Sequence, residues 1–185
     1  MRPQTVVFSM NRYIQQHIRF QKRRFTKLGR GIQIASFPVL FIGFFLFAPA
    51  WWAHQQVSMP MGLDEATGRC GVTITALGGA LYLWTIALFA KAQGTQVPIA
   101  PTQRLVTSGP YAVSRNPMLT SAITMVCGGG VALDSWSFMA GGLVIPTAYL
   151  VYIRVVEEQE LEARFGEEYL SYKRSTPFIM PRLGL

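Results

Sequence analysis

Charged residues are scarce in this sequence, and so are cysteine and histidine. Only 14% of the 185 residues are charged, 50% are hydrophobic, and the mean hydropathy is +0.27. This composition is wrong for a soluble domain and suits a lipid bilayer. The two cysteines, Cys70 and Cys127, lie far apart in apolar stretches, which favours small buried residues over a disulfide. Neither His17 nor His54 has a ligand neighbour at metal-binding spacing, so we expect no metal site.

Acidic residues are absent from residues 1–30, which carry eight of the 17 basic residues. The basic segment stops where an apolar run begins. We therefore expect an amphipathic cytoplasmic leader that lies on anionic membrane lipids. A nucleic-acid-binding protein would spread its positive charge over a folded surface, so we expect no nucleic-acid partner. The leader also resembles a mitochondrial presequence, although anchoring on the cytoplasmic side explains it without a change of compartment.

Four apolar runs predict an all-α, polytopic membrane protein with about four transmembrane helices. They extend from about Ile32 to Ala53, Cys70 to Ala90, Pro117 to Leu133 and Trp136 to Val156. The first two are each close to the length of about 20 residues that crosses the hydrocarbon core. Only Asp134 and Ser135 separate the last two runs, which predicts a C-terminal helical hairpin.

Lysine and arginine are concentrated in the leader, in the loop before the third run and in the C-terminal tail. The loop 54–69 instead carries Asp64 and Glu65. This asymmetry predicts a multi-pass protein with both termini in the cytoplasm. The chain then divides into a leader (1–30), two transmembrane helices (31–90) and a core (91–185); the oligomeric state stays open.

Two polar segments should meet at the cytoplasmic mouth of the hairpin. Asn116 is placed as the N-cap of the third run, with Pro117 at its first helical position. The fourth run continues without a breaker to Gly166, so Glu157 and Glu158 fall where it leaves the membrane. Neighbouring residues on a helix point about 100° apart, so the two glutamates should face different partners.

A simpler interpretation of the glutamates is a charged helix end with Arg154 and Glu158 as a surface pair. The opposing Arg115 and Asn116 favour a site. Beyond Gly166 we expect a short cytoplasmic helix, Glu167 to Lys173, and then an extended tail that closes over a ligand or seals the hairpin.

Glycine pairs and a triplet occur within the apolar runs. They are Gly78 and Gly79, Gly128 to Gly130, and Gly141 and Gly142. Such residues permit close contact between helices in a membrane.

Several motifs resemble those of the integral membrane methyltransferases, a superfamily that includes isoprenylcysteine carboxyl and phosphatidylethanolamine methyltransferases. The matching motifs, in chain order, are GTQVP (94–98), LVTSGPY (105–111), RNPM (115–118), Glu157 and Glu158, Phe165-Gly166, Tyr169, Tyr172, Pro177 and Pro181. The resemblance covers residues 91–183, about half of the chain.

The resemblance implies S-adenosylmethionine as the methyl donor and a lipid or lipid-like acceptor. It implies a cofactor site of Tyr111, Arg115, Asn116, Pro117, Glu157 and Glu158, with Arg115, Glu157 and Glu158 as catalytic residues. Leu105, Phe165, Tyr169 and Ile179 are candidates for the adenine walls. This sequence departs from many relatives at three positions. Asn116 stands where many relatives have His, Leu119 where Tyr is usual, and Ser121 where Gly is usual. These departures leave the identity of the methyl acceptor open.

Two other functions remain as alternatives. One is a membrane steroid or isoprenoid reductase, whose C-terminal half resembles this hairpin but uses NADPH. The other is a non-enzymatic scaffold, for which glycine-rich helices and a polar helix end are sufficient.

Overall fold

The computed structural model describes residues 41–57, 59–91 and 104–179, and the regular structure in these ranges is helical apart from one isolated bridge between Pro60 and Ser135. The prediction of an all-α protein is confirmed for this part. The leader, the first part of the first apolar run (residues 32–40), the GTQVP motif and Pro181 lie outside the described residues. In chain order the elements are η1 (π-helical, Phe41–Phe47), α3 (Ala48–Gln56), α4 (Glu65–Lys91), α5 (Pro110–Val113), α6 (Pro117–Ala132), α7 (Trp136–Tyr152), η2 (π-helical, Ile153–Glu157), α8 (Glu158–Phe165) and α9 (Glu167–Ser175).

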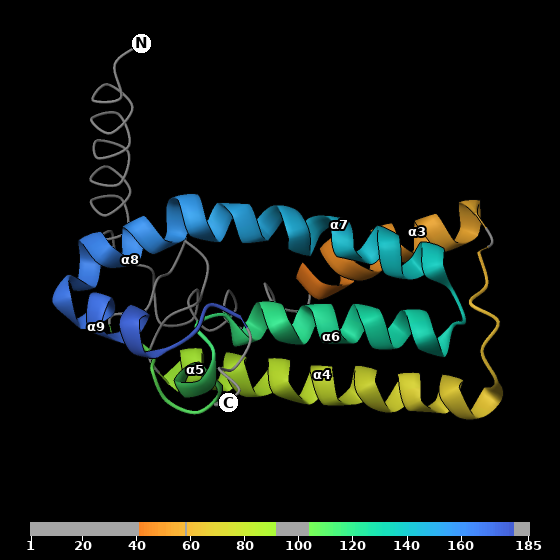
Figure 1. Cartoon of the computed structure of the whole chain (residues 1–185), viewed down its shortest axis with the longest axis horizontal. Coiled ribbons are helices and arrows are strands. Elements are labelled where there is room, and N and C mark those ends of the chain that lie inside the picture. Colours follow the sequence, from red (N-terminus) through yellow and green to blue (C-terminus); the bar gives the residue numbers. More distant parts are fainter. Residues whose placement is uncertain (1–40, 58, 92–103, 180–185) are drawn as a thin grey trace, which may run out of the picture.

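Three long helical layers lie alongside one another, with α4 on one side, α6 in the middle and the continuous α7–η2–α8 helix on the other (Figure 1). Two of them are long and apolar enough to cross a membrane: Glu65–Phe89 and the 30-residue helix Trp136–Phe165. Helix α6 is apolar but shorter, at 16 residues, or roughly 24 Å at 1.5 Å per residue. The protein is therefore assigned to the membrane, whereas the four-span topology stays a prediction.

Glycines allow α4 and α6 to pack backbone against backbone. A Cβ added at Gly128 would lie 2.6 Å from the Thr75 amide nitrogen, and one at Gly78 would lie 3.0 Å from the Ser121 carbonyl oxygen. In α7, Gly142 packs against the side chain of Val126 of α6, where an added Cβ would lie 2.6 Å from a Val126 methyl group. The predicted role of the glycines is confirmed at these positions. Gly79 is different, because its nearest neighbour would be 3.9 Å away.

Leu46, Ala122 and Val126 form the buried centre of the bundle, while large apolar side chains cover its outside. The exposed ones on α4, α7 and η2 are Val72, Ile74, Leu77, Leu83, Trp84, Trp136, Val144, Val151 and Val155. Such faces fit a lipid environment. The expectation that Cys70 is buried is wrong, because its side chain lies on this outer surface; both cysteines are free thiols.

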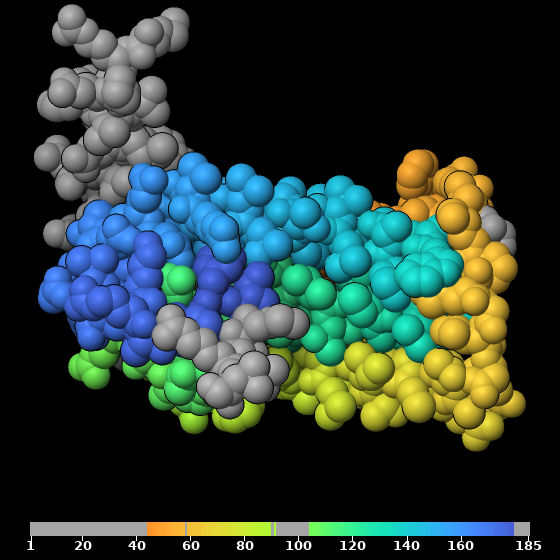
Figure 2. All heavy atoms as spheres, in the orientation of Figure 1, coloured from red at the N-terminus to blue at the C-terminus, as the bar shows by residue number. Residues whose placement is uncertain are grey.

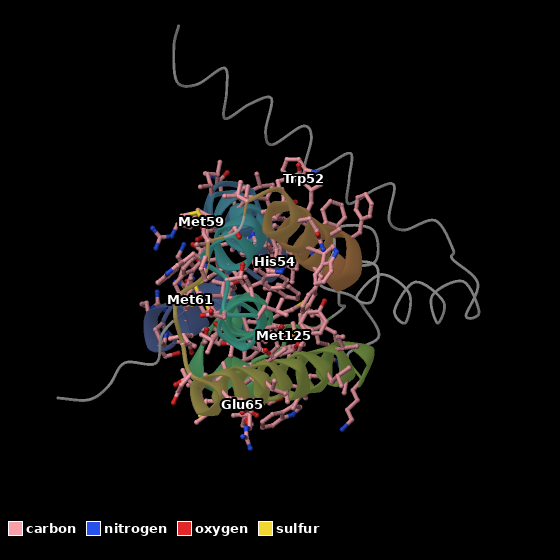
Figure 3. The ribbon with its side chains drawn as sticks, turned by 90° about the vertical axis from the view of Figure 1, so that its right-hand side faces the viewer. Trp52, His54, Met59, Met61, Glu65 and Met125 are labelled. Atoms are coloured by element: carbon pink, nitrogen blue, oxygen red, sulfur yellow. The ribbon has the colours of Figure 1, made fainter. Side chains whose placement is uncertain are left out.

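Asp134 closes the end of the bundle where α3 ends and α4 begins. It adopts a positive φ of 49°, which lets the chain reverse between α6 and α7. Its carboxylate accepts hydrogen bonds from the amides of Met61 and Leu63, at 3.1 and 3.0 Å. Nearby, His54 Nδ1 lies 2.8 Å from Ser135 Oγ. His54, which belongs to α3, is labelled in Figure 3.

Candidate active site

Four segments meet at the opposite end of the bundle: α5, the first turn of α6, α8 and α9 (Figure 1). Figure 2 shows the side chains of α8 and α9 packed into one mass at this end, between α7 along the upper edge and α4 along the lower edge. The predicted approach of the residues before Pro117 to those after Val156 is confirmed by an ion pair between Arg115 and Glu158. A short turn joins α6 to α7, so residues at equal distances from it come level with one another.

An ion-pair network holds this end together. Arg115 Nη1 binds Glu158 Oε1, and only 12% of each side chain is exposed. Lys173 Nζ lies 2.9 Å from the other oxygen of Glu158 and 2.6 Å from Glu162 Oε1. These hydrogen bonds raise the pKa of Lys173 above its ordinary value, so the ammonium stays charged. Both oxygens of Glu158 are therefore used within the protein.

Gly166 allows α9 to fold back on α8 and bring Lys173 to the network. Its φ of 55° is in the region that favours glycine, which confirms the predicted helix end. The helix that follows, Glu167–Ser175, also carries Tyr169 and Tyr172 inward. Tyr169 is 2% exposed, and its hydroxyl lies 3.4 Å from Arg115 Nη1.

The two adjacent glutamates face different partners, as the helical geometry predicts. Glu157 receives a hydrogen bond of 3.3 Å from the Tyr149 hydroxyl, about two turns earlier on the same helix. The alternative surface pair between Arg154 and Glu158 is wrong, because Glu158 turns inward to Arg115 and Lys173. The guanidinium of Arg154 instead stacks on the Phe178 ring, at 4.6 Å.

The chain after α9, Thr176 to Ile179, lies over the start of α6. Pro177 O accepts a hydrogen bond of 2.9 Å from the Arg115 amide, and Phe178 O accepts one of 3.0 Å from Asn116 Nδ2. The Phe178 ring also lies 5.5 Å from the Arg115 guanidinium carbon, on which it stacks. The tail therefore holds Arg115 in place, and we call residues 176–179 the strap.

Asn116 precedes α6 as predicted, but its side chain does not cap the helix. Its amide group turns to the strap, where it donates to the Phe178 carbonyl. Pro117 is buried at the first position of α6. The predicted N-cap position of Asn116 is therefore confirmed, whereas its side chain contacts the strap and makes no capping hydrogen bond.

Tyr111 of α5 is buried beside the network with 3% of its surface exposed. Tyr172 holds it from behind through a hydrogen bond of 2.6 Å to the Tyr111 carbonyl. Burial raises the pKa of the Tyr111 phenol well above its ordinary value, and the charge of Glu157 adds to the shift. The hydroxyl therefore stays protonated, yet it has no hydrogen-bond partner among the described residues.

The four residues expected to form the adenine walls are more widely separated than the charged residues of the network. Tyr169 contacts Arg115, whereas the Phe165 ring lies under the Arg164 guanidinium at 4.9 Å. Leu105 precedes α5 and Ile179 ends the strap, and both are partly buried. The structure thus brings Tyr111, Arg115, Asn116, Glu158 and Tyr169 together and turns Glu157 towards Tyr149.

Three residues of the site were not singled out from the sequence: Lys173, Tyr149 and Phe178. Lys173 lies seven residues after Gly166, and Glu158 lies eight residues before it. A helical hairpin at this glycine therefore brings the two side chains together. Tyr149 precedes Glu157 by eight residues, near two helical turns, which places it on the same face. Phe178 contacts Asn116 through its main-chain carbonyl and Arg115 through its ring. No pattern in the sequence predicts a main-chain contact of this kind.

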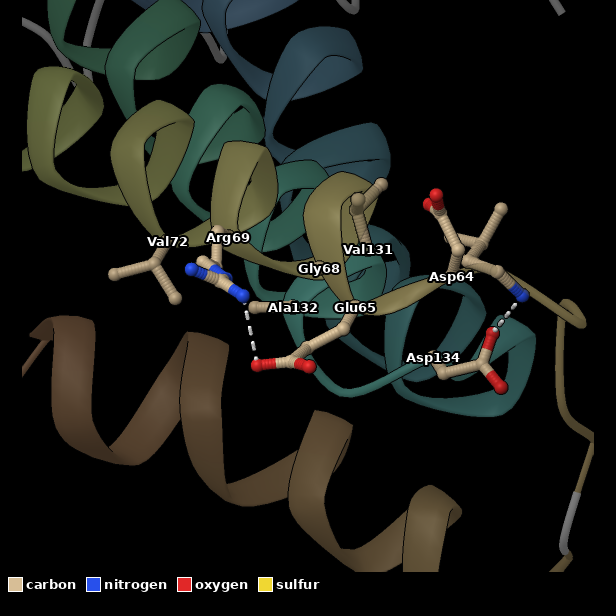
Figure 4. Close-up of a pocket in the computed structure, with 9 residues that line it drawn as sticks. Asp64, Glu65, Gly68, Arg69, Val72, Val131, Ala132 and Asp134 are labelled. Atoms are coloured by element: carbon tan, nitrogen blue, oxygen red, sulfur yellow. Dashed lines mark hydrogen bonds and ion pairs between the residues drawn. The ribbon is translucent and has the colours of Figure 1, made fainter.

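A cavity lies at the other end of the bundle, where Asp64, Glu65 and Asp134 meet (Figure 4). Its volume is about 320 Å³. Each carboxylate already has a partner inside the protein: Thr67 for Asp64, Arg69 for Glu65, and main-chain amides for Asp134. These groups stabilise the start of α4 and the turn after α6.

Comparison with known proteins gives one family and two curated relatives. The family model for phospholipid methyltransferases matches residues 67–168, more than half of the chain. The nickel-cobalt-cadmium resistance protein NccN of Alcaligenes xylosoxydans xylosoxydans is 30% identical over 64% of this chain and 50% of its own length. The cobalt-zinc-cadmium resistance protein CzcN of Cupriavidus metallidurans is 32% identical over 76% of this chain and 58% of its own length. The chain thus spans about half the length of these relatives.

Proposed function

Because the chain belongs to the phospholipid methyltransferase family, we propose that it transfers a methyl group from S-adenosylmethionine to an acceptor in the lipid phase. The acceptor would be a phospholipid headgroup amine or a carboxylate like that of isoprenylcysteine. The site would lie at the cytoplasmic face of a multi-pass protein whose two termini are also cytoplasmic. Anionic lipids would bind the basic leader.

One observation supports a polar ligand at this end more than any other. Arg115 Nε and the Tyr111 hydroxyl are buried polar groups without a hydrogen-bond partner among the described residues. Leaving such a group unpaired costs about 1–3 kcal/mol, and more for a charged one. Both belong to residues that the sequence places in the cofactor site, so a bound ligand would satisfy them.

These groups fit the chemistry of S-adenosylmethionine. Arg115 Nη1 is bound to Glu158, whereas Nε has no partner among the described residues and would donate to the carboxylate of the donor. The start of α6, at Asn116 and Pro117, adds the positive end of a helix dipole beside that carboxylate. Glu157 would bind a positive group of the donor, and Tyr169 with Leu105, Phe165 and Ile179 would supply apolar walls.

The chain's own task would be alignment and exclusion of water. The donor, when bound, supplies a methyl group on a sulfonium that a nucleophile can displace in line. Alignment of two reactants about 3 Å apart can account for roughly 7–11 kcal/mol of a barrier. The strap, held by Asn116 and Arg115, would cover the site and keep water out. An amine acceptor must also lose a proton, which Glu157 or Glu158 could accept.

A labelled-methyl assay tests this function. The purified protein in lipid nanodiscs is incubated with S-adenosylmethionine tritiated in the methyl group and a total membrane lipid extract, and the labelled lipid is then identified. We expect label in a lipid fraction with the wild type, and none with Arg115→Ala. Arg104→Ala, at an exposed position, serves as the control. Absence of labelled lipid with the wild type would contradict the proposal.

The two alternative functions predict different cofactor binding. A steroid or isoprenoid reductase would bind NADPH and not S-adenosylmethionine, and a scaffold would bind neither saturably. Calorimetry with both compounds separates the three functions. We expect heat of binding only with S-adenosylmethionine.

The names of NccN and CzcN suggest a setting for the reaction. Both are resistance proteins against toxic metals, and CzcN aligns with 76% of this chain. We propose that methylation of a membrane component supports growth in the presence of such metals. A deletion strain should then be more sensitive to cobalt or cadmium. The wild-type gene should restore growth and the Arg115→Ala gene should not; equal growth of all strains would contradict this role.

A further inference from the structure

Two methionines, Met59 and Met61, lie on the segment that joins α3 to α4, at the end of the bundle away from the candidate active site (Figure 3). Met59 is 52% exposed, and Met61 is partly exposed. Methionine commonly fills gaps in a hydrophobic core, as Met125 does where α6 packs on α4. Two thioethers outside the core are therefore available to a ligand.

The backbone of this segment directs both methionines to the same side. Pro60 forms an antiparallel bridge with Ser135. On either side of the bridge, the Trp136 amide donates to the Met59 carbonyl at 2.9 Å, and the Met61 amide donates to the Asp134 carbonyl at 3.3 Å. This pattern needs no hydrogen bond from the nitrogen of Pro60, so the proline stiffens the segment without the loss of one. Residues two apart in an extended chain point to the same face, so the two thioethers leave the backbone together.

Trp136 adds an aromatic ring beside this pair of thioethers. It lies opposite Met59 in the antiparallel pairing, and it is also 52% exposed. Side chains opposite each other in such a pair begin about 4.5–5.5 Å apart, between their Cβ atoms. An indole face attracts a cation that is held next to it. The segment and the start of α7 thus present two thioethers and an indole on one exposed surface.

The charges at this end of the bundle favour a cation. In the described part of the chain, this end carries the carboxylates of Asp64, Glu65 and Asp134 against one guanidinium, that of Arg69 (Figure 4). Arg69 is already paired with Glu65 at 3.0 Å. The field of the remaining carboxylates attracts positive ions and repels anions.

His54 does not belong to this set of ligands. Its Nδ1 lies 2.8 Å from Ser135 Oγ, and Ser135 lies opposite Pro60, so its side chain points to the other face of the paired segment. No group of three or more histidine, cysteine or carboxylate side chains suited to a metal ion occurs in the described ranges. The expectation of no metal site was drawn from histidine and cysteine spacing, which does not cover thioethers.

We propose that Met59 and Met61, with the indole of Trp136, form a binding site for a soft monovalent cation, Cu(I) or Ag(I). Thioethers are soft ligands that select such ions over harder divalent ones. They carry no proton at neutral pH, so binding releases none and does not weaken in mild acid, unlike binding at histidine or cysteine. The site lies at the end opposite the candidate active site, and the proposal does not depend on methyl transfer.

Titration with Ag(I), which needs no reductant, tests the site. The full chain is purified in detergent and titrated by calorimetry in a chloride-free buffer. Cys70 and Cys127 are free thiols that would bind Ag(I) themselves, so every variant is made in a Cys70→Ala, Cys127→Ala background. Met59→Leu and Met61→Leu each remove one exposed thioether, and Met125→Leu, inside the bundle, is the matched control. Thermal unfolding followed by circular dichroism shows that each variant is folded.

We expect saturable Ag(I) binding in the background protein and the same affinity in Met125→Leu. The affinity should be at least about tenfold lower in Met59→Leu and in Met61→Leu, because each loses a ligand. Trp136→Phe should weaken binding by about two- to fivefold, the share of an exposed cation–π contact. The affinity should be equal at about pH 5.5 and about pH 7.5, a range in which a histidine ligand would change its charge. Titration with Co(II), a harder ion, should give no heat of binding.

Three results would overturn the proposal. The first is no saturable Ag(I) binding in the background protein, which would leave Met59, Met61 and Trp136 as lipid-facing residues. The second is equal affinity in Met125→Leu and in folded Met59→Leu and Met61→Leu variants. The third is binding that is lost at the lower pH, which would assign the ion to a histidine. None of these results bears on S-adenosylmethionine binding at the other end of the bundle, so the two proposals fail separately.

Discussion

Replacing Gly128 by alanine should destabilise the contact between α4 and α6. The new Cβ would lie 2.6 Å from both the amide nitrogen and the Oγ1 of Thr75 and 2.8 Å from the Gly71 carbonyl oxygen. Two of these three atoms belong to the main chain, so no rotamer change can make room. The helices must move apart along an interface where their backbones now touch.

The size of the effect follows from two opposing contributions. Overpacking of this kind costs typically about 1–3 kcal/mol, and backbone neighbours place it at the upper end. Alanine regains about 1 kcal/mol over glycine in a helix. The net loss is therefore about 2 kcal/mol, which lowers the melting temperature by roughly 4–8 °C for a chain of this size.

Gly79→Ala provides the matched control, because its Cβ would meet only the Met125 sulfur, at 3.9 Å. It should melt at the wild-type temperature or a few degrees above it. The assay is thermal unfolding in detergent, followed by the helical circular dichroism signal. If Gly128→Ala melts together with Gly79→Ala, the close packing of α4 on α6 is not what stabilises the bundle.

Three further predictions concern the end of the bundle that carries the network. Glu158→Gln should lower the free energy of unfolding by about 1.5–3 kcal/mol, the value of a charged hydrogen bond, whereas the exposed Glu168→Gln should be neutral; equal melting would contradict this. Tyr172→Phe, which removes the hydroxyl that donates to a main-chain carbonyl of α5, should cost about 1 kcal/mol in the same assay, and no loss would refute the role of that hydrogen bond. Hydrogen bonds to Glu162 and Glu158 raise the pKa of Lys173 above 10.5. The contribution of Lys173 to the free energy of unfolding is therefore complete below that pH and is lost as the pH rises through the folded-state pKa. Chemical unfolding between pH 9 and pH 12, as an approximate range, should show a loss in the wild type that Lys173→Gln lacks.

The course of the helices was predictable because it depends on local pattern. The apolar runs predicted α4 and the long helix from Trp136 to Phe165, and Gly166 predicted where that helix ends. The approach of Arg115 to Glu158 followed from the short turn at Asp134, since the hairpin brings the residues before Pro117 close to those after Val156. The third run is a shorter helix than a full crossing requires.

The partners within the site were less predictable because they depend on tertiary competition. Asn116 is a good N-cap by residue type, yet its side-chain nitrogen donates to the Phe178 carbonyl of the strap, and its side-chain oxygen does not accept from the amides of α6. Helical geometry separates Glu157 from Glu158 but does not say which one turns to Arg115. That choice depends on Lys173, which reaches Glu158 only because α9 folds back at Gly166.

Calorimetric titration of the wild-type protein with S-adenosylmethionine tests the central claim most directly. The account predicts saturable binding, a loss of affinity of at least about tenfold in Arg115→Ala, and wild-type affinity in Arg104→Ala. Titration with NADPH should give no heat of binding. Absence of saturable binding in the wild type, or equal affinity in Arg115→Ala, would contradict the assignment of this end of the bundle as a methyl-donor site.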